Sequence, residues 1–233
     1  MKRFYKAVTV EPAETGWRVL LDGRAIKTAG GNPQVLPTRA LAQAMEAEWA
    51  GQGEEIDKSA FMLRDLADYA IDVTSSEARG ALVDEIAAYA DTDTLCYRAG
   101  PGEALLERQT QVWEPLLASA EQHYQVRFDR IAGIMHHPQP AATLARMHDA
   151  VAAHGPFGLA ALRMLTSLTA SLVIALAALE PGSDAEALWD AANLEQDWQA
   201  KYWGSDAEAE ELRQIRFGAF QLAIRFAELA RNH

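Results

Sequence analysis

The chain has 233 residues, a net charge of -12 and a sequence pI near 4.9, so it is long enough for one large domain or two small ones with a buried core. Its acidity argues against nucleic acid as a partner, because phosphate binding needs clustered lysine and arginine. The single cysteine, Cys96, excludes an intramolecular disulfide and fits a reducing compartment.

The first forty residues predict a small antiparallel sheet. Residues 4–10 and 17–21 are rich in aromatic and β-branched side chains, and a turn containing proline and glycine separates them. Asp22-Gly23 then predicts a type I′ hairpin leading into residues 24–27. A further short strand is predicted at residues 34–36.

From residue 38 the spacing of apolar side chains becomes that of helices. Thr38 predicts the N-cap of a helix that ends near Gly51. The same periodicity predicts further helices at residues 61–74, 77–90 and 103–124.

Residues 159–179 are the most apolar element of the chain, and we predict that they form one helix. Their uninterrupted part, residues 165–179, is shorter than the ~20 apolar residues that a membrane span needs. A helix that is apolar on nearly all sides is instead typical of the centre of a helical bundle. We therefore expect no stable insertion into a membrane.

The acidic, histidine and cysteine residues of the middle of the chain do not match a metal motif. Asp91 and Asp93 lack the further oxygen ligands and the glycine of a calcium loop. His136 and His137 precede a proline and lack the i,i+4 spacing of zinc ligands. Cys96 is expected to be a buried apolar thiol. We predict no metal, no cofactor and no catalytic residue.

Residues 183–204 predict one helix that begins with a Ser183–Glu186 capping box and stops at Gly204. A spacing of three and four places one stripe of side chains on the same surface: Leu188, Ala191, Glu195, Trp198 and Tyr202.

Glu195 interrupts that otherwise apolar stripe. A buried carboxylate without a partner is costly, so Glu195 must meet an arginine, meet a partner protein or lie at the edge of the face. Arg163 and Arg213 are the candidate arginines. Asp197 is predicted to pair with Lys201, four residues further on.

The last helix is predicted to begin at Ser205 with a second capping box. Its two apolar stripes are Leu212, Ile215, Ala219, Leu222, Phe226 and Leu229, and beside them Phe217, Phe220, Ile224 and Ala227. We expect this helix to pack antiparallel against residues 183–204 and to leave part of its second stripe for a partner.

Short segments spread over essentially the whole chain carry a family signal. They are Lys2-Arg3-Phe4-Tyr5-Lys6, Leu21-Asp22-Gly23-Arg24, Lys27-Thr28, Leu36-Pro37-Thr38, Glu48-Trp49 with Gln52, Ala67 with Ala70-Ile71-Asp72, residues 91–97, Trp113-Glu114-Pro115-Leu116 and residues 194–204. In combination they resemble the assembly chaperones that hold the α subunit in the catalytic head of F-type ATP synthase. Gln196 departs from the consecutive glutamates of that family, and Phe61-Met62 stands where the family tends to have Met-Pro.

This resemblance implies an α+β protein of two domains, without catalytic activity or cofactor. Residues 1–76 would form a small β-rich domain with packed helices, and residues 77–233 a helical domain. Because the match starts at Lys2 without a transit extension, it indicates a bacterial protein of the cytoplasm. We expect the free protein to be a monomer.

The resemblance also implies that the protein binds the newly made α subunit and covers the surface that will face the β subunit. The acidic residue that serves this function in the family falls in the run Glu195-Gln196-Asp197, and the stripe favours Glu195. The residues expected to contact the partner are Glu195, Asp197, Trp198, Gln199, Tyr202 and Trp203.

The alternative is a hydrolase that uses Asp91, Asp93 or Glu195 as acid and base, although the chain has no nucleophile elbow or phosphate loop.

Overall fold

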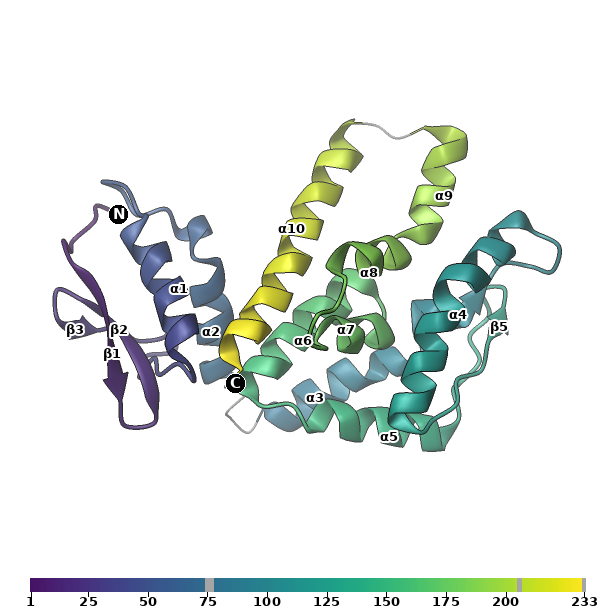
Figure 1. Ribbon diagram of the computed structural model, residues 1–233, viewed down its shortest axis with the longest axis horizontal. Helices are drawn as coiled ribbons and strands as arrows, with labels where there is room; N and C mark the ends of the chain where they lie inside the picture. Colours follow the sequence, from purple (N-terminus) through teal and green to yellow (C-terminus); the bar gives the residue numbers. More distant parts are fainter. Residues whose placement is uncertain (74–77, 205–206, 232–233) are drawn as a thin grey trace. The chain divides into compact units, whose positions relative to one another are not determined.

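The computed structural model describes residues 1–73, 78–204 and 207–231, which belong to two compact units (Figure 1). The first unit comprises Met1–Gly80, Gly155–Ala161 and Arg225–His233, and the second comprises Ala81–His154 and Leu162–Ile224. Division into independent domains at residue 76 stays a prediction.

The first unit contains an antiparallel sheet in the order β1 (Val8–Ala13), β2 (Gly16–Leu21) and β3 (Arg24–Ala25). Asp22 and Gly23 join β2 to β3 with φ angles of 48° and 78°, as the predicted type I′ turn requires. The strand predicted at residues 4–10 begins later than expected. The reason is that the Asp22 carboxylate accepts the N–H groups of Lys6 and Ala7, which therefore do not pair with a strand. Residues 34–36 form an isolated bridge between Leu36 and Trp17 rather than a strand.

Two helices pack beside this sheet. Helix α1 (Arg39–Ala50) contacts β1 and β2, and α2 (Met62–Asp72) packs on α1. The Thr38 hydroxyl accepts the N–H of Leu41 at 3.1 Å, which confirms the predicted N-cap. One face of α1 is fully or almost fully buried and forms the core with β2: Leu41, Ala42, Met45 and Trp49.

The remaining elements are mainly helical. They are α3 (Arg79–Ala87), α4 (Ala104–Tyr124), α5 (Ala141–Ala152), α6 (Pro156–Thr169), α7 (Leu172–Ala178), α8 (Ala185–Ala192), α9 (Leu194–Trp203), α10 (Ala207–Ala230), a parallel pair of two-residue strands, β4 (Tyr97–Arg98) and β5 (Ile131–Ala132), and 3-10 turns at Lys58–Ala60, Ala88–Ala90 and Thr94–Cys96. The predicted starts at residue 77 and at Ser205 lie outside the described residues. Together with the N-terminal sheet, these helices confirm the α+β class.

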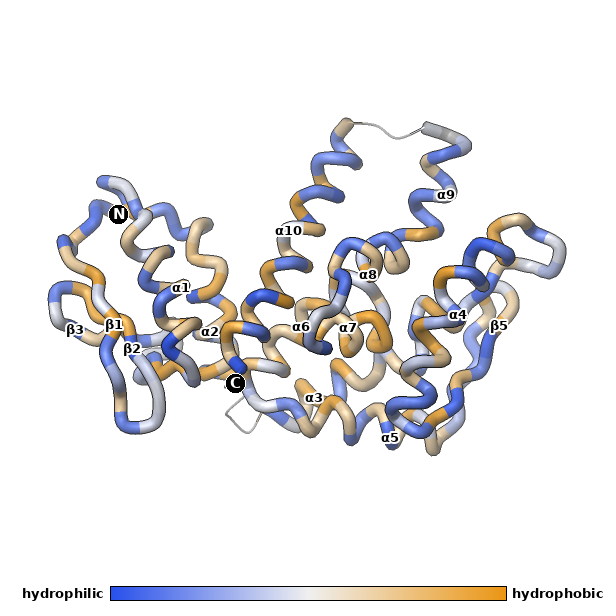
Figure 2. The backbone as a smooth tube through the Cα atoms, viewed as in Figure 1, coloured by the Kyte–Doolittle hydropathy of each residue, from blue (hydrophilic) through white to orange (hydrophobic). Residues whose placement is uncertain are grey.

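The single helix predicted at residues 159–179 is wrong, because the chain breaks between α6 and α7. Ala170 adopts a left-handed φ of 49°, and the Ser171 hydroxyl then caps α7 by accepting the N–H of Ile174 at 3.0 Å. Six of the seven residues of α7 are buried, in keeping with its hydrophobic colouring in Figure 2. Within the described ranges, every helix is too short or too polar to span a bilayer.

Candidate functional site

The segment that carries the predicted contact residues is two helices rather than one. Asn193 separates α8 from α9, and its buried side-chain amide donates to the carbonyl of Trp189 at 2.8 Å. The N-cap is Asp184, which accepts the N–H of Ala187, and not the predicted Ser183. The predicted stop at Gly204 is confirmed, with a φ of 83°. Figure 1 shows that α8 and α9 run in different directions.

The predicted stripe therefore does not lie on one surface. Leu188 and Ala191 are buried on α8, whereas Glu195 and Tyr202 are exposed on α9. Trp113 of α4 fixes the end of α8, because its buried indole N–H donates to the carbonyl of Ala191 at 2.8 Å. The consequence is an α8 with one buried face and an α9 from which Glu195 and Tyr202 reach solvent.

Glu195 is held by an amide and not by an arginine. The Gln109 side chain on α4 donates to Glu195 Oε1 at 2.6 Å. Gln109 is fully buried, and its carbonyl oxygen accepts the N–H of Ala99 at 2.8 Å. The arginine bridge predicted as one alternative is thus wrong for Glu195, since Arg163 pairs with Glu85 and Arg213 pairs elsewhere on α8 and α9. Glu195 keeps its exposed carboxylate at a fixed position on the first turn of α9.

Arg213 of α10 holds the acidic side chains of the two shorter helices. It pairs with Asp197 of α9 through both guanidinium nitrogens, and it lies 3.4 Å from Asp190 of α8. The predicted pairing of Asp197 with Lys201 is therefore wrong. A bidentate arginine outcompetes a lysine for a carboxylate because its planar group donates two hydrogen bonds at once.

Among the described side chains of α9, Trp198 is half-buried and Tyr202 is exposed. The Trp198 and Tyr202 rings lie 5.5 Å apart, and Tyr202 is 62% exposed. Lys201 Nζ lies 6.0 Å from the Trp198 ring, close enough for a cation–π contact. Gln199 is exposed on the same helix. The side chain of Trp203 lies outside the described residues.

An open groove of about 640 Å³ runs beside these residues within the second unit. Its walls come from α4, α8 and α9, and Trp198, Asp197 and Lys201 line it together with Arg108 and Leu194. A lining that combines apolar side chains with charges of both signs is suited to binding a segment of another protein.

Helix α10 also exposes apolar side chains to solvent, but they are not the ones predicted to be left for a partner. Leu212 and Ile215, of the first stripe, are 56% and 63% exposed. The second stripe was expected to be left for a partner, but Phe220 and Ile224 are buried, and Trp189 packs against the rings of Phe217 and Phe220.

Two of the carboxylates proposed for a hydrolase, Asp91 and Asp93, are engaged by backbone N–H groups. Asp93 is fully buried, and its carboxylate accepts the N–H groups of Leu95 and Val173 at 3.0 Å each. Asp91 accepts the N–H of Gln139 and lies 3.5 Å from His136. Among the described residues, no three His, Cys, Asp or Glu side chains are arranged to hold a metal ion. The Asp93 carboxylate therefore has the role of a cap.

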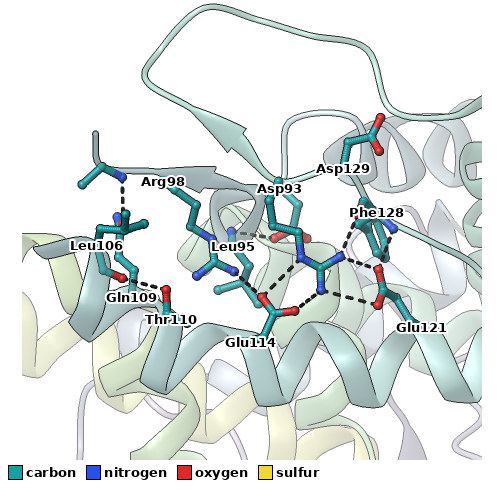
Figure 3. Close-up of polar contacts among 12 residues, drawn as sticks. Asp93, Leu95, Arg98, Leu106, Gln109, Thr110, Glu114, Glu121, Phe128 and Asp129 are labelled. Carbon is teal, nitrogen blue, oxygen red and sulfur yellow. Dashed lines mark hydrogen bonds and ion pairs between the residues drawn. The ribbon is translucent and has the colours of Figure 1, made fainter. Parts of the chain in front are cut away.

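Figure 3 shows an arginine–glutamate cluster further along α4 from Gln109. Arg130, beside β5, donates to Glu114 and Glu121, and Arg98 of β4 lies 3.3 Å from Glu114. Although burial opposes it, the hydrogen bond from Arg130 lowers the pKa of Glu121. This cluster holds β4 against α4. Ala99 directly follows β4, and its N–H donates to the side chain of Gln109.

Sequence reasoning did not identify Gln109. The signal available was its position, since Gln109, Trp113 and Leu117 follow at four-residue intervals along the buried face of α4. A polar residue on such a stripe needs a partner for its amide.

Comparison with known proteins identifies the family. The model of the ATP12 chaperone protein family matches residues 2–121, which is more than half of the chain. The chain belongs to the ATP12 chaperone family. The crystal structure of Atp12 from Paracoccus denitrificans is similar over 99% of this chain and 98% of that one, with a TM-score of 0.93 and 35% identity. An aspartate-to-lysine mutant of the same protein matches equally well.

Two other relatives agree with this assignment. The crystal structure of the Atu1473 protein of Agrobacterium tumefaciens is 38% identical, covers 99% of this chain and 86% of that one, and has a TM-score of 0.92. The mitochondrial Atp12 protein of Schizosaccharomyces pombe is 26% identical over 222 residues, which are 91% of this chain and 76% of that protein. The predicted resemblance to the assembly chaperones is confirmed, and the protein is a chaperone rather than an enzyme. The hydrolase alternative is therefore wrong.

Proposed function

We propose that this ATP12 family chaperone acts in the assembly of a bacterial F-type ATP synthase by binding the unassembled α subunit. It covers the surface of that subunit that later faces the β subunit, and it acts in the cytoplasm as a monomer. An exposed apolar interface on a newly made subunit is prone to aggregation, so a dedicated binder is needed until assembly.

The observation that carries this proposal is the fixed carboxylate of Glu195 on the same helix as the half-buried Trp198 and the exposed Tyr202. Gln109 orients Glu195 from the protein interior, so little side-chain entropy is lost when a partner binds it. Trp198 and Tyr202 provide aromatic anchors next to the groove, and such residues dominate the energy of protein interfaces. Asp197, Gln199 and Trp203 belong to the same helix and complete the proposed contact set.

Co-elution in size-exclusion chromatography tests the proposal. The chaperone is mixed with the α subunit of its own ATP synthase, and the β subunit serves as the control. We expect co-elution with α alone. Binding of β alone, or of neither subunit, would overturn the choice of partner.

Variants of Glu195 then locate the contact. Glu195→Lys should weaken α-subunit binding about tenfold or more, the loss typical of a central interface residue. Glu195→Gln retains an oxygen that can accept from Gln109 and removes only the charge. Glu228→Lys, at an exposed position of α10, makes the same charge change elsewhere and should bind like the wild type. Equal affinity of all three folded variants would remove Glu195 from the interface.

A further inference from the structure

The first unit contains a pocket that the proposed function does not use. Its volume is about 480 Å³, and its lining comes from the N-terminal segment, the β2–β3 hairpin, α1 and α2. Four of the segments that carry the family resemblance meet here, and they contribute Tyr5, Asp22, Lys27 and Trp49 among others. Figure 1 shows the hairpin and α1 side by side in this unit.

One wall of the pocket is a chain of aromatic rings. The Phe4 and Tyr5 rings lie 5.3 Å apart and the Tyr5 and Trp49 rings 5.5 Å. Behind the pocket lining, the Phe61 ring lies 4.3 Å from that of Trp49 at a tilt of 45°. Tyr5, Trp49 and Phe61 are buried, but Phe4 is 64% exposed at the pocket. Core packing explains the three buried rings and leaves the exposed phenyl group without a structural role.

The charges that line the pocket are mainly positive, in a protein of net charge -12. Arg24 and Lys27 are exposed, and neither forms a salt bridge with any described residue. Arg64 is already paired with Asp68 at 3.4 Å. The Asp22 carboxylate is occupied by the backbone N–H groups of Lys6 and Ala7. Arg24 and Lys27 are therefore the charges available to a ligand.

A buried donor at the same pocket lacks an acceptor. Trp49 is 7% exposed, and its indole N–H finds no acceptor among the described residues. Trp49 is otherwise well anchored, since its carbonyl accepts the Tyr5 hydroxyl at 2.7 Å. Because this nitrogen has almost no accessible surface, a ligand in the pocket contacts the ring of Trp49 and not its N–H.

We infer that this pocket binds an acidic polypeptide segment. An apolar or aromatic side chain of the segment packs against Phe4 and Tyr5, and adjacent carboxylates pair with Arg24 and Lys27. The positive lining selects an acidic ligand over a basic one, and the aromatic wall selects a peptide over a bare anion. This is a second binding surface, independent of the one on α9.

A fluorescein-labelled synthetic peptide, acetyl-Glu-Glu-Leu-Phe-Glu-Glu-amide, tests the inference on the full chain. Fluorescence anisotropy should show saturable binding that weakens as salt rises. The indole N–H resonance of Trp49 should shift during the titration in an NMR spectrum. A peptide with glutamine in place of glutamate should bind at least tenfold more weakly.

Matched variants assign the binding to the pocket. The double variant Arg24→Glu with Lys27→Glu should weaken binding at least tenfold, and Phe4→Ser severalfold. Lys58→Glu, an exposed charge reversal in the same unit and away from the pocket, should have no effect. Absent saturation, equal binding of the glutamine peptide, or an equal loss with Lys58→Glu would each overturn the inference. Because no ATP synthase subunit is used, failure here is distinguishable from failure of the proposed function.

Discussion

Asp93 shows how one side chain shapes the fold around the break between two helices. Its carboxylate has no access to solvent, and it accepts N–H groups from its own 3-10 turn and from the first turn of α7. Burial favours the neutral acid and outweighs these hydrogen bonds, which raises the pKa of Asp93 from 3.8 to about 6. The same group thus acts as a helix cap and carries a protonation equilibrium.

The raised pKa predicts a specific dependence of stability on pH. Between pH 4 and 6 the folded protein keeps the proton on Asp93 while the unfolded chain releases it, so folding is favoured at the lower pH. The contribution of Asp93 to the free energy of unfolding should fall by a few kcal/mol, at about 1.4 kcal/mol per pKa unit, as pH rises through this window.

Denaturant unfolding of the wild type and of Asp93→Asn at several pH values measures this contribution. The difference in the free energy of unfolding between the two proteins should change between pH 4 and 6 and be flat above pH 7. Other carboxylates titrate in both proteins and cancel in the difference. Two parallel curves over the whole range would show that Asp93 has an ordinary pKa.

At the scale of elements, α9 is secured by only a few contacts with its neighbours. Gln109 holds Glu195 and Arg213 holds Asp197, and both acidic residues lie in the first turn of α9. The last turn carries Lys201 and Tyr202, which are exposed. A helix attached in this way has a fixed start and exposes the side chains of its last turn to solvent.

Arg213→Ala is predicted to loosen α9 without unfolding the core. Loss of the pair with Asp197, which is partly exposed, should cost about 1 kcal/mol locally, or roughly a fivefold increase in opening. Hydrogen exchange followed by mass spectrometry should show faster exchange of α9 amides and unchanged exchange in α7. Arg225→Ala, an exposed arginine of the same helix, is the control. Unchanged exchange in α9 would mean that Gln109 alone secures it.

The sequence predicts the features that local interactions determine and misses those that depend on residues far away in the sequence. The helices α1, α2 and α4 and the Asp22-Gly23 turn were predicted because local caps and periodicity determine them. The breaks at Ala170 and Asn193 were missed because neither position carries glycine or proline. A distant side chain, Asp93, stabilises the first of them.

The predictions for the candidate site show the same difference between local and long-range interactions. Residue spacing predicted that Trp198 and Tyr202 lie together on α9, as their rings do at 5.5 Å, but it did not predict that the stripe is broken between α8 and α9. The partner of Glu195 lies 86 residues away in the sequence on α4, and the partner of Asp197 on α10 competes with a nearer lysine. Choices of this kind depend on tertiary packing, which the spacing of one helix does not encode.

At the scale of the whole molecule, exposed apolar surface and net charge oppose one another. Tyr202, Leu212 and Ile215 are each more than half exposed on α9 and α10. Such side chains favour association with another protein surface, including a second copy. The net charge of -12 repels a second copy, attracts a basic partner and leaves an uncharged partner unaffected.

We therefore predict a monomer whose self-association is limited by charge. Size-exclusion chromatography with light scattering should give 25.5 kDa at about 0.15 M salt, where the Debye length is about 8 Å. In about 1 M salt the repulsion is screened, so weak dimerisation should emerge, and Ile215→Glu should abolish it. A stable dimer at the lower salt that Ile215→Glu dissociates would mean that a second copy covers this surface. The proposed partner, the α subunit, would then have to displace that copy, and its binding would depend on chaperone concentration.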